Sequence, residues 1–515
     1  MLSKVFTAAI QGIEAYPVTI ETLVEKGATF TIVGMADTAV KESYQRMVSA
    51  INHSGIQFPR KRIVINLAPA DVKKEGAYFD LPMAIGVLTS NENIPLDAVE
   101  GCMLMGELSL DGTVLPVKGV LPMAIKAREM GIKKLIVPEA NVTEAAVVNR
   151  VDVYGVRTLT EAIGVLCDPQ CGLNPTRIDT RALFAADAGN FDFDFSEVKG
   201  QESVKRAFEV ACAGGHNILL IGPPGAGKSM MAKRLPSILP PLSMAEALET
   251  TKIHSVAGKL NRGSMLMTRR PFRTPHHTVS PVALVGGGVN PMPGEISLAH
   301  NGVLFLDEFP EFSRPVLEVL RQPIEDRVIT IARAKYTVDY PASFMLVASM
   351  NPCPCGYYGH PTRACTCQPG AVARYMNRIS GPLLDRIDIQ VEIQPVEFDD
   401  MASTAESERS EDIRTRVMRA REMQQERYKA EKGIHCNAQM NSRLLRRYAW
   451  PDAEGLEKLK ERMMRLNMSA RAFDRILRVA RTIADLDASP IVLSRHIAEA
   501  INYRNLDRGN YGKLF

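Results

Sequence analysis

The chain has 515 residues, of which 46% are hydrophobic and 23% charged, and its 62 basic and 58 acidic residues give a net charge of +4. At roughly 150 residues per domain this length predicts about three domains, and the composition excludes disordered, collagen-like and disulfide-scaffold proteins. No apolar run approaches the ~18 residues of a membrane span, and the N-terminal apolar stretch is too short for a signal peptide. We therefore expect a cytoplasmic chain with no membrane partner.

The first third of the chain, residues 1–170, has a mixed pattern. Short β-rich runs at 29–33, 62–67 and 134–137 alternate with helical stretches such as 120–130. This alternation predicts a domain of mixed helices and strands, of the α/β or α+β class.

Two stretches of this region resemble the proteolytic domain of Lon proteases, which implies an S5-like α+β fold. Residues 80–84 match the stretch that carries the family's serine nucleophile, and residues 118–121 match the stretch that carries its lysine. Met83 stands at the serine position and Leu121 at the lysine position, and neither can act as nucleophile or general base. The resemblance therefore implies a catalytically inert domain. Two polar residues lie nearby but offset from the motif, Ser90 and Lys126.

A compositional break separates this region from the next. Residues 171–195 show no clear periodicity and follow a Pro-containing turn, so we interpret them as a linker. From 196 to 396, short apolar strands alternate with helices, which is typical of an α/β domain with a parallel sheet. Residues 397–515 are helical and charged, and they predict a C-terminal helical domain.

A phosphate-binding loop follows the apolar strand at 217–221 and opens a helix. It matches G-x-x-x-x-G-K-[ST] at every fixed position, and its residues are Gly222, Pro223, Pro224, Gly225, Ala226, Gly227, Lys228 and Ser229. Glycines let backbone N–H groups turn around phosphate oxygens, and the helix N-terminus adds a positive dipole. We expect Lys228 to reach the β- and γ-phosphates of ATP and Ser229 to hold Mg²⁺.

Basic charge is concentrated between residues 250 and 294. This stretch contains six Lys or Arg residues and three His residues but no acidic residue. Such a run can follow a phosphate backbone, and our candidate DNA contacts in it are Arg269, Arg270 and Arg273. The alternative is a solvated loop whose charges are neutralised by other segments.

Two carboxylates follow the buried strand at 302–306. Asp307 and Glu308 emerge at its carboxyl end, where open α/β sheets bind their ligands. We expect Asp307 to hold Mg²⁺ and Glu308 to activate the attacking water, which makes nucleotide hydrolysis the predicted reaction. A solvated strand end is the alternative.

Residues 327–340 alternate like a β-hairpin with its tip near residues 334 and 335. Arg333 and Lys335 lie close to that tip, so we add them to the candidate DNA contacts. A hairpin used only at subunit interfaces is the alternative.

A cluster of four cysteines follows, in two C-x-C pairs separated by nine residues: Cys353, Cys355, Cys365 and Cys367. Four thiolates in one loop can form a tetrahedral, structural Zn²⁺ site, although the spacing departs from the usual C-x₂₋₄-C. His360 could replace one ligand. The alternatives are four reduced thiols and a redox disulfide.

The order of these motifs resembles that of AAA+ ATPases. By this resemblance Asn351 is the sensor-1 residue that helps to orient the water, and Arg386 is the arginine finger that reaches a neighbour's site. Arg471 is the sensor-2 arginine, with Arg475 as the rival assignment, and each arginine could instead form a surface ion pair. An arginine finger acting on a neighbour implies a ring, most often a hexamer.

The basic stretch and the hairpin resemble those of the helicase-like AAA+ branch, which includes MCM helicases and magnesium chelatases and places such elements at the pore. Together with the Lon-like region and the four-cysteine loop, they make the whole chain similar to the ComM/YifB family. The resemblance implies a hexameric helicase that promotes branch migration of single-stranded or branched DNA, in natural transformation or recombination, with recombination proteins as further partners.

Three function classes therefore compete. The first is a DNA translocase or branch-migration helicase. The second is a magnesium-chelatase-like motor subunit that serves metal insertion or remodels a protein partner, although we find no porphyrin-binding feature. The third is a Lon-type protease, which Met83 and Leu121 argue against.

Overall fold

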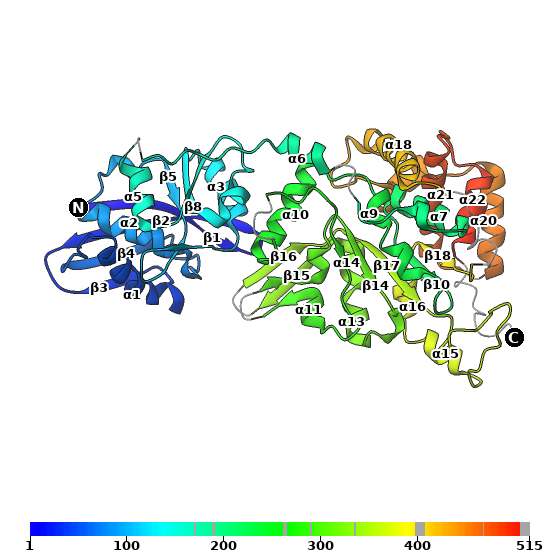
Figure 1. Cartoon of the computed structure of the whole chain (residues 1–515). Coiled ribbons are helices and arrows are strands. Elements are labelled where there is room, and N and C mark those ends of the chain that lie inside the picture. The colour runs from blue at the N-terminus through cyan, green and yellow to red at the C-terminus, as the bar shows by residue number, and fades with distance from the viewer. Residues whose placement is uncertain are drawn as a thin grey trace.

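The computed structural model describes residues 1–168, 171–187, 191–260, 265–288, 291–333, 336–396, 407–466 and 468–504. Its three parts follow one another along the molecule: the N-terminal part at one end, the central part with the phosphate loop, and the C-terminal helices at the other end (Figure 1). None of the helices in the described residues is long and apolar enough to span a membrane.

The N-terminal part is built on a mixed seven-stranded sheet in the order β3-β4-β2-β1-β5-β8-β9. Its strands are β1 (Leu2–Gln11), β2 (Glu14–Glu25), β3 (Phe30–Val33), β4 (Arg62–Ala68), β5 (Cys102–Leu104), β8 (Lys134–Pro138) and β9 (Asp152–Val156), and a small β6–β7 ribbon (Glu107–Leu108, Val114–Leu115) lies apart. Its helices are α1 (Thr38–His53), α2 (Asp80–Ser90), α3 (Val120–Glu129), α4 (Val142–Ala145) and α5 (Leu159–Cys167). The α+β fold predicted for this region is confirmed.

The segment interpreted as a linker contains ordered structure. Thr176 bridges to Val153 of β9, and helix α6 (Thr180–Asp187) follows it. Farther on, the Phe195 side chain is fully buried in the core of the central part. The segment therefore contacts the N-terminal part through Thr176 and the central part through Phe195.

The central part contains a parallel five-stranded sheet in the order β11-β14-β17-β10-β18. Its strands are β10 (Ile218–Ile221), β11 (Phe272–Arg273), β14 (Val303–Leu306), β17 (Met345–Met350) and β18 (Ile389–Glu392), with α7 (Glu202–Gly214), α8 (Lys228–Ala232), α9 (Leu235–Ile238), α10 (Met244–Val256), α11 (Pro281–Val285), α12 (Glu295–Leu298), α13 (Arg314–Val319), α14 (Arg321–Asp326), α15 (Ala371–Met376) and α16 (Gly381–Leu384) around them. The parallel sheet is confirmed, whereas the helix expected after the phosphate loop is divided into α8 and α9.

Two hairpins extend from this sheet. The first pairs β12 (Gly286–Gly287) with β13 (Met292–Pro293), and the second pairs β15 (Val328–Arg333) with β16 (Tyr336–Pro341). The second confirms the hairpin predicted from the alternation of residues 327–340.

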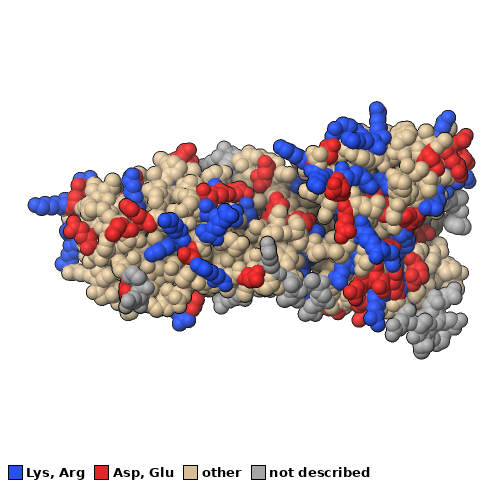
Figure 2. All heavy atoms as spheres, turned by 90° about the horizontal axis from the view of Figure 1, so that it is seen from above, with Lys and Arg blue, Asp and Glu red and all other residues tan. Residues whose placement is uncertain are grey.

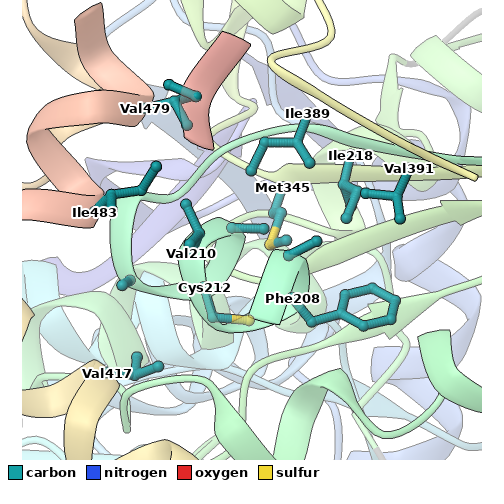
Figure 3. Close-up of a cluster of buried hydrophobic side chains, with 14 of the residues drawn as sticks. Phe208, Val210, Cys212, Ile218, Met345, Ile389, Val391, Val417, Val479 and Ile483 are labelled. Atoms are coloured by element: carbon teal, nitrogen blue, oxygen red, sulfur yellow. The ribbon is translucent and has the colours of Figure 1, made fainter. Parts of the chain in front are cut away.

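The C-terminal part consists of α18 (Ser410–Tyr428), α19 (Ser442–Tyr448), α20 (Ala453–Leu466), α21 (Ala470–Leu486) and α22 (Ser494–Asn502). These helices share one hydrophobic core with the central sheet. Val417 of α18 and Ile483 of α21 pack in the same cluster as Phe208 of α7 and the strand residues Ile218 and Ile389 (Figure 3). A movement of the C-terminal helices would therefore shift side chains that pack against β10, the strand that precedes the phosphate loop.

The N-terminal part docks onto the central part through the turn between β1 and β2. Ile13 at this turn is 7% exposed and packs in the core cluster of the central part. A Cβ on neighbouring Gly12 would lie 2.7 Å from a methyl carbon of Val338 in β16. An ion pair of 2.7 Å between Glu14 and Lys252 adds to this contact.

Candidate functional site

The phosphate loop is shaped by its glycines. Gly225 and Gly227 adopt φ values of +80° and +83°, which residues other than glycine rarely adopt. A Cβ on Gly222 would lie 2.6 Å from the backbone oxygen of Ile393, so only glycine fits where the loop leaves β10. The loop conformation therefore depends on glycine at these positions, and the backbone that follows β18 packs against its first residue.

Lys228 is folded back into this loop. Its Nζ donates to the backbone oxygens of Gly222 (2.7 Å) and Pro223 (2.9 Å) and to Oδ1 of Asn351 (3.0 Å). Burial lowers the pKa of Lys228, and Asp307 opposes that shift. Lysine and the predicted sensor residue therefore meet at the carboxyl edge of the sheet, where neighbouring parallel strands end.

Asp307 lies at the same edge, between two hydroxyl groups. The Oγ of Ser229 donates to its Oδ2 at 2.6 Å, and the Oγ of Ser349 donates to its Oδ1. Hydroxyl and carboxylate oxygens are the hard ligands that Mg²⁺ prefers, so Ser229 and Asp307 fit the predicted ion. Ser349 is absent from the sequence prediction, because only the pairing of β14 with β17 brings it beside Asp307.

Glu308 has a different environment. Its backbone is left-handed, with φ of +54°, and its side chain is 60% exposed. Oε2 of Glu308 lies 3.3 Å from Nδ1 of His277, which belongs to the basic stretch. A largely exposed carboxylate can accept a proton from water, as the predicted role requires.

The three predicted arginines lie elsewhere. Arg386 precedes β18, and its guanidinium donates to Glu325 (2.8 Å) and to the backbone oxygen of Pro382 (2.6 Å). Because the Arg386 backbone oxygen accepts from the side chain of Asn217, Arg386 lies at the amino edge of the sheet, opposite the phosphate loop. The structure does not bring it to the chain's own site.

Helix α21 carries both candidates for the sensor-2 role. Arg471 is exposed near the start of this helix. Arg475, one turn later, pairs with the buried carboxylate of Asp388 at 2.8 Å. Although burial opposes ionisation, the charge of Arg475 and a hydrogen bond from the Asn217 N–H lower the pKa of Asp388. Arg475 therefore already has a structural role, which leaves Arg471 as the candidate for contact with a ligand.

Acidic residues from other segments pair with the basic stretch. Arg270 donates to the backbone oxygens of Pro240 (2.6 Å) and Asn301 (2.7 Å) and pairs with Glu246 (3.2 Å), and its side chain is only 16% exposed. Arg273 forms a two-bond pair with Glu295 (2.7 and 2.8 Å). The expectation that Arg270 contacts DNA is thereby corrected, because its hydrogen-bonding groups are used inside the fold.

The other candidate DNA contacts have mixed outcomes. The guanidinium of Arg269 lies 5.8 Å from the ring centre of Phe191 and is partly exposed. Arg333 is the last residue of β15, whereas its side chain and the whole of Lys335 lie outside the described residues. On the face seen in Figure 2, Lys and Arg lie among Asp and Glu over most of the molecule, and the described residues form no continuous basic surface along it.

The four cysteines converge as predicted. Their sulfur atoms all lie within 4.8 Å of one another, with Cys353 Sγ 3.3 Å from Cys355 Sγ and 3.7 Å from Cys365 Sγ. Tetrahedral Zn–S bonds of about 2.3 Å separate sulfur atoms by about 3.8 Å, so the arrangement fits a Zn²⁺ ion. A Cβ on Gly356 would lie 2.5 Å from Cδ of Pro224, so the cysteine loop rests directly on the phosphate loop.

Met83 and Leu121, at the positions of the Lon serine and lysine, are both fully buried. Leu121 N–H donates to Oε1 of Glu144 at 3.0 Å, a carboxylate that also accepts from Ser255 of α10. Burial raises the pKa of Glu144. The region that would hold a protease site is filled by packing and by contacts with the central part.

Comparison with known proteins covers all three parts of the chain. The profile for magnesium chelatase, subunit ChlI, matches residues 194–401, its C-terminal profile matches 407–504, and a profile for subunit ChlI of Mg-chelatase matches 20–141. YifB of Escherichia coli (strain K12) is 42% identical, and the competence protein ComM of Haemophilus influenzae is 41% identical; each alignment covers 98% of both chains. Lon protease 2 of Bacillus subtilis is 28% identical over 27% of this chain and 25% of its own length.

Proposed function

The chain belongs to the ComM/YifB family of magnesium-chelatase-like AAA+ proteins, and from this premise we propose that it is an ATP-driven DNA motor. In this proposal it forms a cytoplasmic homo-hexameric ring that acts on single-stranded or branched DNA as a helicase or branch-migration translocase. Recombination or natural transformation would be its setting, with recombination proteins as partners, and the similarity to the competence protein ComM supports the link to competence.

The observation that carries the proposal is the cluster at the carboxyl edge of the sheet. Lys228 donates to Asn351 there at 3.0 Å, and Ser229 donates to Asp307 at 2.6 Å. Phosphates that bind there would replace the two loop carbonyls at Lys228 and add negative charge beside its partly buried amine. Ser229 and Asp307 would hold Mg²⁺, which would supply positive charge to neutralise the phosphates.

Hydrolysis also requires a general base and an arginine from an adjacent subunit. Glu308 would accept a proton from the attacking water, Asn351 would orient that water, and Arg386 of an adjacent subunit would stabilise the transferring phosphoryl group. Glu308→Gln is expected to bind ATP with near-normal affinity but to lower kcat by about 10²–10⁴-fold, the range for loss of a general base. Glu311→Gln, which alters an exposed carboxylate paired with Arg378, is the matched control.

For DNA contacts we retain Arg269, Arg273, Arg333 and Lys335. The parallel pairing of β11 with β14 supports Arg273, because it places the basic stretch beside the strand that precedes Asp307. A decisive experiment measures ATP hydrolysis and three-strand branch migration with single-stranded, duplex and forked DNA at two salt concentrations. Stimulation that falls steeply with salt is expected, because cations on the protein displace condensed counterions. Wild-type hydrolysis that no DNA changes would contradict the proposal.

One observation favours a second candidate: the profiles for magnesium chelatase subunit ChlI match all three parts of the chain. The chain could then be a motor that serves metal insertion or remodels a protein partner. In that case hydrolysis would be indifferent to DNA in the same assay, whereas an added partner protein would stimulate it. Lys335→Ala separates the candidates further, since only a DNA motor should lose stimulation while keeping its basal rate.

A further inference from the structure

A second acid-free stretch runs through the cysteine loop and the helix that follows it. Residues 351–384 contain no Asp or Glu, but they include Arg363, Arg374 and Arg378. Arg378 pairs with Glu311 at 2.7 Å. Among the described residues, no carboxylate pairs with Arg363 or Arg374, and both arginines are exposed. The stretch therefore carries positive charge that the fold does not neutralise.

The tip of the cysteine loop, residues 357–364, presents an aromatic ring with an arginine over it. The guanidinium of Arg363 lies 4.4 Å from the ring centre of Tyr357, and its Nη1 donates to the Tyr357 hydroxyl at 2.7 Å. Nδ1 of His360 accepts from the backbone N–H groups of Thr362 (3.2 Å) and Arg363 (3.1 Å), which fixes the turn that carries the arginine. Contacts within the tip thus determine its geometry.

The tip lies at the surface, whereas the base of the loop is anchored. Residues 361–364 are all exposed, and Tyr357 is half-buried. Cys353 and Gly356 are buried, and Gly356 packs on Pro224 of the phosphate loop. Helix α15, which follows the loop, lies at the margin of the central part, far from the N-terminal part (Figure 1). A ligand can therefore approach the tip from solvent while the base of the loop stays beside the phosphate loop.

An aromatic ring and an unpaired arginine in an acid-free stretch suit single-stranded nucleic acid. Unpaired bases stack on aromatic side chains whatever their sequence, and arginine donates to phosphate oxygens. An exposed cation–π contact is weak, whereas an arginine–phosphate hydrogen bond is strengthened by charge. Arg363 can therefore exchange the ring of Tyr357 for a phosphate and leave that ring face to a base.

We propose that the tip of the cysteine loop is a binding site for single-stranded nucleic acid, in which Tyr357 stacks on a base and Arg363 binds the adjoining phosphate. The positive charge of the acid-free stretch favours a polyanion over other partners. The inference rests on the proposed function, because it identifies a contact for the DNA on which the motor would act.

The test measures the affinity of the full-length protein for a fluorescent oligothymidylate and for a DNA duplex. Tyr357→Ala should weaken binding of the single strand on the order of tenfold, within the range for one stacked base, and should leave duplex binding nearly unchanged because paired bases are not free to stack on the ring. Tyr357→Phe keeps the ring and should stay close to wild type. Arg363→Ala should reduce the salt slope for the single strand by about 0.7, the value for one phosphate contact. Arg378→Ala is the matched control, since this arginine of the same stretch is paired with Glu311, and it should alter neither quantity.

Urea unfolding and the oligomeric state are measured for each variant, and both should match the wild type. Wild-type affinity for the single strand in both Tyr357→Ala and Arg363→Ala would overturn the inference, while stimulation of hydrolysis by DNA would leave the proposed function standing. Loss of the oligomer in Tyr357→Ala would also overturn it, because the tip would then be a contact between subunits. If Tyr357→Ala weakens single-strand binding but no DNA changes wild-type hydrolysis, the inference stands and the proposed motor function fails. A wild type that binds no DNA would overturn both.

Discussion

The guanidinium of Arg270 forms contacts inside the fold, which is unusual for a residue that binds an external ligand. It pairs with Glu246 at the start of α10 and donates to backbone oxygens on two other segments. Arg270→Ala should therefore lower the free energy of unfolding by about 2 kcal/mol, below the 3–5 kcal/mol of a fully buried pair because Glu246 is 34% exposed. Urea unfolding of the variant measures this loss.

The control for Arg270 is Lys259→Ala, which removes an exposed charge from the same acid-free stretch. Substitutions at such exposed positions usually change stability by no more than about 0.5 kcal/mol. Equal stability of the two variants would mean that the Arg270 contacts contribute nothing. A salt-dependent loss of DNA affinity in Arg270→Ala, without loss of stability, would return this residue to the DNA surface.

At the same scale, motif residues could be predicted and their partners could not. Lys228 and Asp307 are predicted because phosphate and Mg²⁺ chemistry requires their types at those places, and Asn351 is predicted through the resemblance to AAA+ ATPases. Ser349 and His277 belong to no sequence motif. Each lies near the site only because its strand, β17 or β11, pairs with β14. A strand partner becomes visible only when the pairing is known.

At the scale of elements, the cysteine loop packs directly against the phosphate loop. Gly356 packs on Pro224 of the phosphate loop, and Cys353 follows Asn351 by two residues. If a Zn²⁺ ion holds this loop, its loss should loosen the surface on which the phosphate loop rests. Cys365→Ser should therefore lose the metal and weaken ATP binding on the order of tenfold, a cost of about 1.4 kcal/mol.

Metal content per chain and the Kd for a fluorescent ATP analogue are measured together for this variant. Cys167→Ser, which changes an exposed cysteine of α5 in the N-terminal part, should alter neither quantity. Full metal content in Cys365→Ser would argue against the four-cysteine site. Metal loss with unchanged nucleotide affinity would argue against the mechanical link to the phosphate loop.

The β15–β16 hairpin and strand β1 differ in how clearly the sequence predicts them. Residues 328–333 and 336–341 form a ribbon in which buried apolar side chains, such as Ile329 and Val338, alternate with exposed polar ones, so the pattern predicts the β15–β16 hairpin. Strand β1 lies between β2 and β5 and contacts both α2 and α3. Because Thr7, Ala8 and Ala9 are all buried, the alternation of β1 fails there and the strand reads as a short apolar run.

Across the whole molecule, three buried histidines link stability to pH. Burial lowers the pKa of His216, His254 and His496, so each is held neutral in the fold and binds its proton only on unfolding below the unfolded value of about 6.5. Their contribution to stability is therefore present above about pH 6.5 and is lost as the pH falls below it. Each unfolding-linked proton adds a slope of up to about 1.4 kcal/mol per pH unit.

Urea unfolding at pH 7.5, 6.5 and 5.5, in buffer that contains zinc, measures this slope. His216→Gln should make the slope smaller by the equivalent of one proton, because His216 sits fully buried between Thr482 and Asp388. His53→Ala, at an exposed position, should leave the slope unchanged. Stability that rises on acidification through this range would contradict the assignment.

The position of Arg386 bears on how the whole molecule is assembled. Strands β10 and β18 are four residues long, so about 13 Å of sheet separate Arg386 at the amino edge from the phosphate loop at the carboxyl edge. If Arg386 serves the site of an adjacent subunit, Arg386→Ala and Lys228→Ala should each be nearly inactive alone. Lys228→Ala destroys a subunit's own site but leaves its Arg386 intact, whereas Arg386→Ala does the reverse.

Mixing the two variants therefore distinguishes a shared site from a self-contained one. In a mixed ring, an Arg386→Ala subunit with an intact phosphate loop can receive Arg386 from a Lys228→Ala neighbour, so ATP hydrolysis should recover well above the sum of the separate rates. The ratio of the two variants at maximum recovery should be near equal, since each working site needs one subunit of each kind. Absence of recovery, with mixed oligomers verified by differently tagged chains, would assign Arg386 to its ion pair with Glu325 alone.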